Sequence, residues 1–159
     1  MGRIIRDIER LKEIINEEKA RGKRIVFGNG CFDILHVGHI RYLRGAKELG
    51  DCLVVAVNDD TSVETLGKRK KVVTPVDERV EIISAIDCVD YITVFSEPTV
   101  ERLLRELKPD IHAKGTDYTE DSVPERDIVL SYGGRVAIVG DPKNHSTTDI
   151  IKTIQGLKE

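Results

Sequence analysis

Hydrophobic positions follow a helical period at the start of the chain. Apolar side chains recur every three or four residues there, at Ile4, Ile8, Leu11 and Ile15. Gly22 follows them and is typical of a helix end. Residues 1–22 are therefore predicted to be a segment built around an amphipathic helix of about 18 residues.

After residue 22, short apolar runs alternate with amphipathic stretches. The runs predict five strands, at residues 24–27, 53–57, 91–95, 110–113 and 135–139. The stretches between and after them predict helices over 38–49, 75–86, 98–107, 125–132 and from 146 onward. The polar residues 58–76 are predicted to be the longest loop, and Ile82, Ile83 and Ile86 to form the buried stripe of the helix after it. Strands that alternate with helices favour a parallel sheet covered on both faces. We therefore expect residues 23–159 to form a single α/β domain, a Rossmann-like, doubly wound fold with a five-stranded sheet.

Composition and charge argue against several classes of protein, among them nucleic-acid-binding, membrane and disulfide-rich proteins. The chain has 159 residues and a net charge of −3, which argues against a broad surface for nucleic acid or membrane. Its apolar runs fall short of the roughly 20 residues that a membrane helix needs, and its N-terminus lacks a signal-peptide core. Three widely spaced cysteines argue against a disulfide framework and favour the reducing cytoplasm, namely Cys31, Cys52 and Cys88.

Three polar turns each follow a predicted strand, at residues 28–39, 114–118 and 145–148. In open parallel sheets, ligands bind beyond the carboxyl ends of the strands, at the point where the strand order reverses. We therefore expect the three turns to converge at one edge of the sheet.

The first turn carries His36 and His39, which lie on one face of the predicted helix. Gly38 between them leaves room for a ligand to approach the backbone. The free N–H groups of a helix N-terminus favour anions, so this turn is predicted to grip a phosphate. One alternative is that the two histidines merely cap the helix. Another is a zinc site with Cys31, which lacks a fourth ligand at a sensible spacing. Cys31 is better explained by packing than as a nucleophile.

The third turn contains a run of hydroxyl side chains. Ser146, Thr147 and Thr148 could hold phosphates together with backbone N–H groups. Ser146 and Asp149 also have the spacing of a capping box, so Ser146 could be an ordinary helix cap. The two roles are compatible.

Residues 30–39 resemble the first signature of the cytidylyltransferase-like nucleotidyltransferases, with His-Val-Gly-His in the position of their H-x-G-H. Residues 146–148 resemble the S-T-[ST] signature of the same superfamily. The resemblance implies that His36 and His39 act on the nucleotide phosphates as catalytic residues. It also implies a nucleotide-binding set, made of Gly30, Cys31, Phe32, Asp33, Gly38, Arg79, His145, Ser146, Thr147 and Thr148.

Residues 114–118 resemble the K-G-x-D-Y turn of the adenylyltransferases that act on heptose 1-phosphates. Residues 57–60, 89–90, 108–110 and 133–134 also fall in that subfamily's order. The resemblance implies transfer of AMP from ATP to D-glycero-D-manno-heptose 1-phosphate, giving ADP-heptose and pyrophosphate for lipopolysaccharide or another surface glycan. It implies Mg²⁺ bound with ATP rather than a metal site of the protein. A homodimer is the expected assembly. Lys114 would act on the incoming phosphate or an α-oxygen. The substrate-binding set would be Asp33, Lys68, Asp117 and Tyr118, with Lys68 closing over the β- and γ-phosphates.

Several of these roles have alternatives. Lys68 belongs to a lysine-rich run, residues 68–71, that could be a solvated loop. Arg79 could face the cleft or form a surface salt bridge. Asp33 could orient a histidine or a substrate hydroxyl, and Asp117 could hold a sugar hydroxyl or close its own turn.

Two other functions are also weighed. Cytidylyl transfer to a polyol or amino-alcohol phosphate is disfavoured because residues 141–145 replace the R-T-E-G-I-S-T run of those enzymes. A non-catalytic nucleotide sensor is disfavoured because His36, His39, Lys114 and Ser146 are all present.

Overall fold

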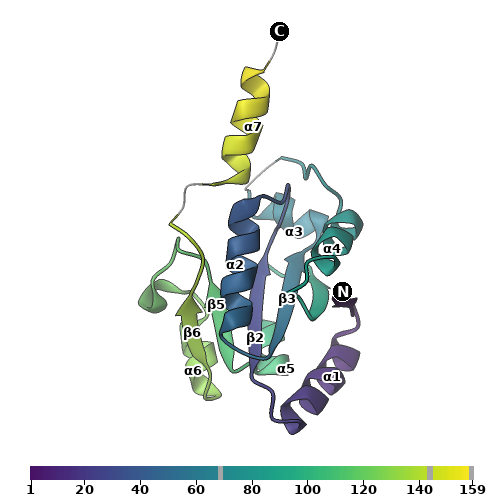
Figure 1. Ribbon diagram of the computed structural model, residues 1–159, viewed down its shortest axis with the longest axis vertical. Helices are drawn as coiled ribbons and strands as arrows, with labels where there is room; N and C mark the ends of the chain where they lie inside the picture. The colour runs from purple at the N-terminus through teal and green to yellow at the C-terminus, as the bar shows by residue number, and fades with distance from the viewer. Residues whose placement is uncertain (68–69, 143–144, 158–159) are drawn as a thin grey trace.

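The computed structural model describes residues 1–67, 70–142 and 145–157 (Figure 1). Its strands are β1 (Arg3–Ile4), β2 (Ile25–Gly30), β3 (Cys52–Asn58), β4 (Tyr91–Phe95), β5 (Ile111–Lys114) and β6 (Arg135–Ile138). Its helices are α1 (Ile8–Ala20), α2 (Val37–Glu48), α3 (Asp60–Thr65), α4 (Val76–Ser84), α5 (Glu101–Leu107), the 3₁₀ turn η1 (Glu120–Ser122), α6 (Arg126–Ser131) and α7 (Thr147–Gly156).

The described strands form one parallel sheet in the order β1-β4-β3-β2-β5-β6. The prediction of five strands is wrong, because β1 adds a sixth at the edge, where Arg3 and Ile4 pair with Tyr91 and Ile92. Ile4 thus belongs to a strand and not to the first helix. That helix, α1, has 13 residues and begins after Asp7, whose carboxylate caps it by accepting from the N–H groups of Glu9 and Arg10.

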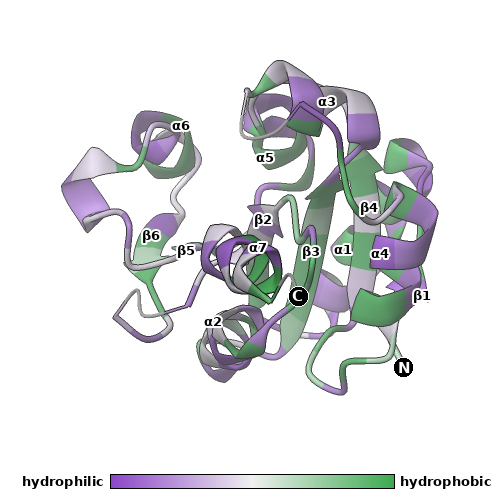
Figure 2. Ribbon diagram, turned by 90° about the horizontal axis from the view of Figure 1, so that it is seen from above, coloured by the Kyte–Doolittle hydropathy of each residue, from purple (hydrophilic) through white to green (hydrophobic). Residues whose placement is uncertain are grey.

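Helices cover both faces of the sheet, as the sequence predicts. On one face, α1, α5 and α6 bury apolar side chains such as Leu11, Leu104 and Val129. On the other face, α2 and α4 bury Leu43 and Ile83. Between the two layers lies β3, with every residue buried, and its apolar character is visible in the view from above (Figure 2).

Two local predictions are corrected. The loop predicted over residues 58–76 contains α3, whose first turn is capped by Asp59 accepting from the N–H of Ser62 at 2.7 Å. In α4 the buried stripe is formed by Val80 and Ile83, while Ile82 is 49% exposed. In a helix as short as α3, surrounded by polar residues, too few apolar positions repeat to show a helical period, so the sequence pattern does not predict this helix.

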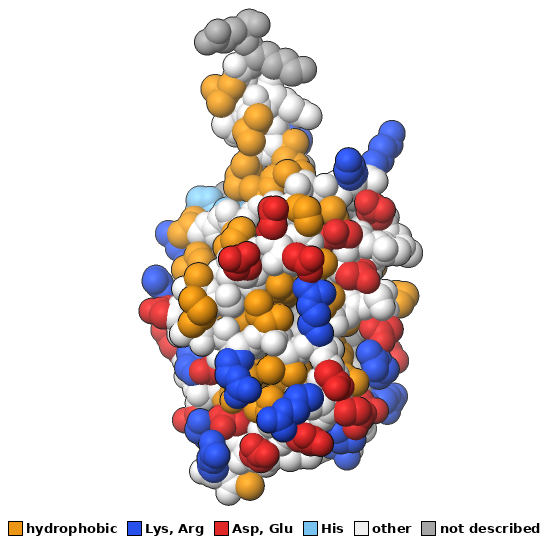
Figure 3. Space-filling view, turned by 90° about the vertical axis from the view of Figure 1, so that its right-hand side faces the viewer, with side chains coloured by type: hydrophobic (Ala, Val, Ile, Leu, Met, Phe, Trp, Pro, Cys, Tyr) orange, Lys and Arg blue, Asp and Glu red, His pale blue; other side chains and the backbone are white. Residues whose placement is uncertain are grey.

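The strand order reverses between β2 and β5, which lie side by side although residues 31–110 separate them in the chain. The carboxyl ends of these two strands therefore define the switch point of the sheet. Beyond this edge, α7 projects away from the rest of the fold (Figure 1). It buries none of its residues, and hydrophobic side chains lie along it (Figure 3). Ile154 on α7 is 58% exposed, and Leu157 directly after it is 72% exposed. Among the described residues, no helix combines the length and the hydropathy needed to cross a bilayer.

Candidate active site

A cleft of about 680 Å³ opens at the carboxyl ends of β2 and β5. Its volume lies in the range typical of small-molecule sites. The three polar turns singled out in the sequence meet around it. From the predicted set, the cleft is lined by Gly30, Cys31, Phe32, Asp33, His36, Gly38, His39, Lys114, Asp117, Tyr118, His145, Ser146, Thr147 and Thr148.

The two histidines are fixed by the start of α2. His36 is the N-cap residue, and its Nδ1 accepts a hydrogen bond from the N–H of Gly38 at 3.1 Å. His39 reaches back, and its Nδ1 accepts from the N–H of His36 at 3.2 Å. A ring nitrogen that accepts carries no proton, so each neutral imidazole holds its proton on Nε2. The histidines therefore do cap the helix, and capping leaves both Nε2–H groups to serve as donors.

The charge state of the histidines follows from their surroundings. Burial, together with the charge of His36, lowers the pKa of His39 to about 4. Burial and the neighbouring His145 also lower the pKa of His36. The rings of His36 and His39 lie close, with centroids 3.9 Å apart, so charging both at once is unfavourable. Near neutral pH the pair thus offers neutral N–H donors.

Gly38 is required for a different reason from the one expected. A Cβ at this position would lie 2.8 Å from Cε1 and 2.9 Å from Nδ1 of His36. The imidazole of His36 therefore fills the space that a Cβ would occupy, while Gly38 itself lines the cleft. Any side chain here would push His36 out of its capping position.

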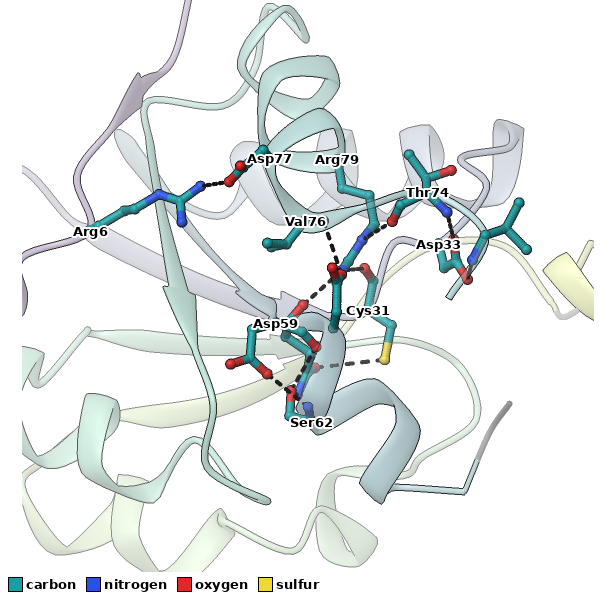
Figure 4. A network of polar contacts seen from close by, with 12 residues as sticks. Arg6, Cys31, Asp33, Asp59, Ser62, Thr74, Val76, Asp77 and Arg79 are labelled. Carbon is teal, nitrogen blue, oxygen red and sulfur yellow. Dashed lines mark hydrogen bonds and ion pairs between the residues drawn. The ribbon is translucent and has the colours of Figure 1, made fainter. Parts of the chain in front are cut away.

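The turn between β2 and α2 is strained. Phe32 and Ile34 have φ of 53° and 58°, which is uncommon for residues other than glycine. Between them Asp33 accepts hydrogen bonds from the N–H groups of Val73 at 3.0 Å and Thr74 at 2.9 Å. Asp33 thus ties the histidine turn to the loop before α4 (Figure 4).

Arg79 also holds the turn between β2 and α2 by hydrogen bonds. Its side chain is not among the residues that line the cleft, so Arg79 does not face the cleft as expected. The surface salt bridge considered as the alternative is also wrong, because the side chain is 1% exposed. Its guanidinium donates to three backbone carbonyls, those of Cys31 at 2.5 Å, Asn58 at 2.7 Å and Thr74 at 2.8 Å. It also pairs with Asp60 at 2.6 Å. Arg79 therefore joins the ends of β2 and β3 to the start of α4.

Lys114 enters the cleft from the end of β5. Its ammonium group lies 4.7 Å from the ring centroid of Tyr118, within range of a cation–π contact. The turn that carries Asp117 is closed by the N–H of Tyr118 donating to the carbonyl of Gly115 at 3.2 Å. Lys68, the cation chosen from the lysine-rich run, lies outside the described residues.

The N-terminus of α7 forms another wall. Ser146 is the N-cap, and its Oγ accepts from the N–H of Asp149 at 3.0 Å, which confirms the predicted cap. Thr147 donates its hydroxyl to the carbonyl of Asp33 at 2.8 Å. His145 lies beside the pair of histidines, with its ring centroid 6.5 Å from that of His36. A phosphate role for these residues stays a prediction.

Several lining residues were not among the predicted site residues, namely Asn29, Tyr42, Asn58 and Glu125. Tyr42 donates its hydroxyl to the carbonyl of Ala113 at 2.7 Å, and Asn29 Oδ1 lies 3.0 Å from Nε2 of His112. The first three lie on regular elements, where single polar residues carry no distinctive spacing. Glu125 follows a proline in a connection, and only its burial distinguishes it from the exposed acids around it.

Metal ligands do not gather in the described part of the chain. No group of three or more His, Cys, Asp or Glu side chains there is arranged to hold a metal ion. The thiol of Cys31 instead points to Asn58, with Sγ 3.7 Å from Oδ1.

Comparison with known proteins matches this site to a family. The family described as Cytidylyltransferase-like matches residues 27–153, a span that includes both histidines, Lys114 and the start of α7. The chain belongs to the cytidylyltransferase-like family.

Curated relatives are similar over nearly the whole chain. The bifunctional protein HldE of Geobacter metallireducens is 49% identical over 150 residues, which cover 94% of this chain and 31% of the relative. The protein of the same name from Geobacter sulfurreducens is 47% identical over the same shares. The chain thus spans about a third of the length of these relatives.

Solved structures share the fold. A lipopolysaccharide core biosynthesis protein from Thermoplasma volcanium is 31% identical with a TM-score of 0.67, over 77% of this chain and 100% of that one. Pantoate-β-alanine ligase from Francisella tularensis matches at a TM-score of 0.59 over 98% of this chain and 77% of that one. It is 16% identical and therefore supports the fold alone.

Proposed function

We propose that this chain transfers AMP from ATP to D-glycero-D-manno-heptose 1-phosphate, giving ADP-heptose and pyrophosphate. The observation that carries the reaction type is the paired capping of His36 and His39, which turns two neutral Nε2–H donors toward one cleft. The choice of sugar is supported by the turn at residues 114–118 and by the similarity to the HldE proteins.

The reaction needs positioning and charge stabilisation rather than a covalent intermediate. A sugar phosphate, with a second pKa of about 6, is already largely a dianion at neutral pH, so no general base is required. Its oxygen attacks the α-phosphorus, the bond to the bridging oxygen breaks, and pyrophosphate leaves with that electron pair. Charge builds on the oxygens of the α-phosphate during attack. The Nε2–H groups of His36 and His39 would donate to phosphate oxygens, and Lys114 would supply a positive charge.

Magnesium is proposed as the metal that accompanies ATP, where it neutralises phosphate charge. Mg²⁺ bound to a nucleotide takes most of its ligands from phosphate oxygens and water, with one or two from protein. The donor set of the described cleft fits this mode, because it holds isolated carboxylates such as Asp141 and no cluster that could hold the ion by itself.

A single substitution tests the role of the histidine pair. We expect His39→Ala to lower turnover at least about 100-fold, by analogy with the loss of an oxyanion donor. Turnover would be measured as ADP-sugar formed from ATP, Mg²⁺ and each anomer of heptose 1-phosphate. The matched control is Arg44→Ala, which removes an exposed side chain from the same helix. Near-normal turnover of His39→Ala would refute this assignment. A panel of the four nucleoside triphosphates, followed by pyrophosphate release, tests the choice of ATP over CTP.

We further propose that the enzyme is a homodimer that works in the cytoplasm. The three cysteines are all free, in keeping with a reducing compartment. Sedimentation equilibrium at micromolar protein would give the assembly, and a monomer there would refute it.

A further inference from the structure

Glu125 is a buried acid in the cleft, and one of its carboxyl oxygens has no hydrogen-bond partner among the described residues. It directly precedes α6, lines the cleft, and is 6% exposed. Its Oε2 is buried and makes no hydrogen bond within the described structure. The two other buried acids in that part of the chain differ in this respect. Glu18 pairs with Arg21 and Lys23, and Asp33 accepts from two backbone N–H groups.

An unpartnered buried carboxyl oxygen costs free energy. Burying a polar group without a hydrogen bond is unfavourable, and burying a charged group without one is more so. Glu125 is the residue before a short helix, yet its side chain makes no capping hydrogen bond that would account for it. A ligand that enters the cleft and donates hydrogen bonds to this carboxyl group would offset the cost.

The position of Glu125 indicates which part of a ligand it meets. The histidines are carried by α2, which packs on one face of the sheet, whereas α6 packs with α5 on the other face. The cleft runs across the sheet edge between them, and Val100, which packs in the core on the side of α6, and Pro124 line it together with Glu125. A carboxylate repels phosphate. Its partner is therefore a hydrogen-bond donor at the end of the ligand remote from the phosphate groups.

We propose that Glu125 determines specificity by accepting hydrogen bonds from hydroxyl groups of a bound sugar ring. This inference rests on the proposed function, in which both substrates carry such hydroxyls: the heptose of the acceptor and the ribose of the nucleotide. A site whose buried acceptor must be satisfied rejects analogues that lack the matching donor more strongly than an apolar pocket would. Glu125 thus selects for a hydroxylated ring at this end of the cleft.

Direct binding separates the two sources of the hydroxyl. Dissociation constants would be measured by calorimetry for heptose 1-phosphate, for α,β-methylene-ATP, and for monodeoxy analogues of each. The variants are Glu125→Ala, which removes the acceptor, and Glu125→Gln, which keeps its shape and removes its charge. The control is Asp127→Ala, because Asp127 lies on α6 with its side chain 98% exposed.

We expect the dissociation constant of one of the two ligands to rise tenfold or more in Glu125→Ala and by a smaller factor in Glu125→Gln. The dissociation constant of the other ligand, and those of both ligands for the control variant, should stay within twofold of wild type. The ligand that binds more weakly is the one whose hydroxyl group contacts Glu125. For the monodeoxy analogue that lacks the contacted hydroxyl, wild type and variant bind alike. If both ligands bind every variant within twofold of wild type, or if every deoxy analogue shows the same loss as its parent, the proposal is overturned.

Thermal unfolding of the free proteins gives a second readout. Removing an unpartnered buried carboxyl group leaves stability unchanged or raises it, so Glu125→Gln should melt at or above the wild-type temperature while binding more weakly. A lower melting temperature in Glu125→Gln would mean that the carboxyl group supports the fold, and would also overturn the proposal. Failure of the proposed function would look different. The wild type would then form no ADP-heptose, while the ATP-analogue series would still report on Glu125.

Discussion

Replacing His112 with leucine tests how burial controls charge beneath the site. His112 lies on β5, is fully buried, and packs against the ring of Phe27. Its Nε2 bonds to Asn29, while its Nδ1 is buried without a partner in the described structure. Burial, reinforced by the charge of Lys114, lowers the pKa of His112 to about 3. The folded protein therefore holds this ring neutral throughout the ordinary pH range.

The magnitude follows from linkage between protonation and folding. In the unfolded chain the ring takes up a proton near its ordinary pKa of 6.5, whereas in the folded chain it does so near 3. Between these values the unfolded state binds more protons, so stability falls as the pH falls. For these two pKa values, His112 alone costs about 2 kcal/mol of stability between pH 7.5 and pH 5.

Urea denaturation at the two pH values would measure this cost. We expect His112→Leu to change stability by no more than about 1 kcal/mol at pH 7.5, because it removes one hydrogen bond and one unpartnered nitrogen. At pH 5 the variant should then have gained about 2 kcal/mol relative to wild type. Thr93→Val is the control, since Thr93 is equally buried with an unpartnered hydroxyl and does not titrate. Equal pH dependence of wild type and His112→Leu would refute the reasoning.

Two further substitutions address the framework of the site. Arg79→Met should destabilise the protein by about 3–5 kcal/mol, because it removes a buried guanidinium that donates to three backbone carbonyls and to Asp60. In denaturant titrations the exposed Arg102→Met should cost no more than about 1 kcal/mol. Equal losses in the two variants would contradict the structural role of Arg79. Gly50→Ala should cost about 1–3 kcal/mol, since its Cβ would lie 2.8 Å from the carbonyl oxygen of Arg24. Gly156→Ala meets no atom within 4 Å and should not lower the melting temperature, so a similar loss in both alanine variants would refute the steric argument.

The parts of the fold that sequence predicts well are those in which burial repeats over many residues. The run that became β3 is buried along its whole length, so its apolar pattern is unbroken. The two-residue strand β1 is too short to show a period, and Ile4 happens to fit the helical spacing of α1. Pairing of β1 with β4 is a contact between distant residues, and a local pattern cannot contain it.

In the candidate site, too, features set by local sequence are predictable and features set by contacts between distant residues are not. The histidine turn is local, so its spacing places His36 and His39 together at the start of a helix, whereas their capping is only an alternative to the phosphate grip. Arg79 and Glu125 depend on what surrounds them in space. An arginine on a helix and a glutamate after a proline are exposed in most proteins, and here only tertiary packing buries them.

The contacts of Asp33 have a consequence for how the binding of one substrate affects the binding of the other. Its carboxylate holds the loop before α4, its carbonyl holds Thr147 at the start of α7, and its own backbone belongs to the histidine turn. Three segments from distant parts of the chain thus meet at one residue. A phosphate that orders any one of them lowers the entropic cost of ordering the other two. Under the proposed function, binding of nucleotide and of sugar phosphate should therefore be cooperative, and by thermodynamic linkage each should strengthen the other by the same factor.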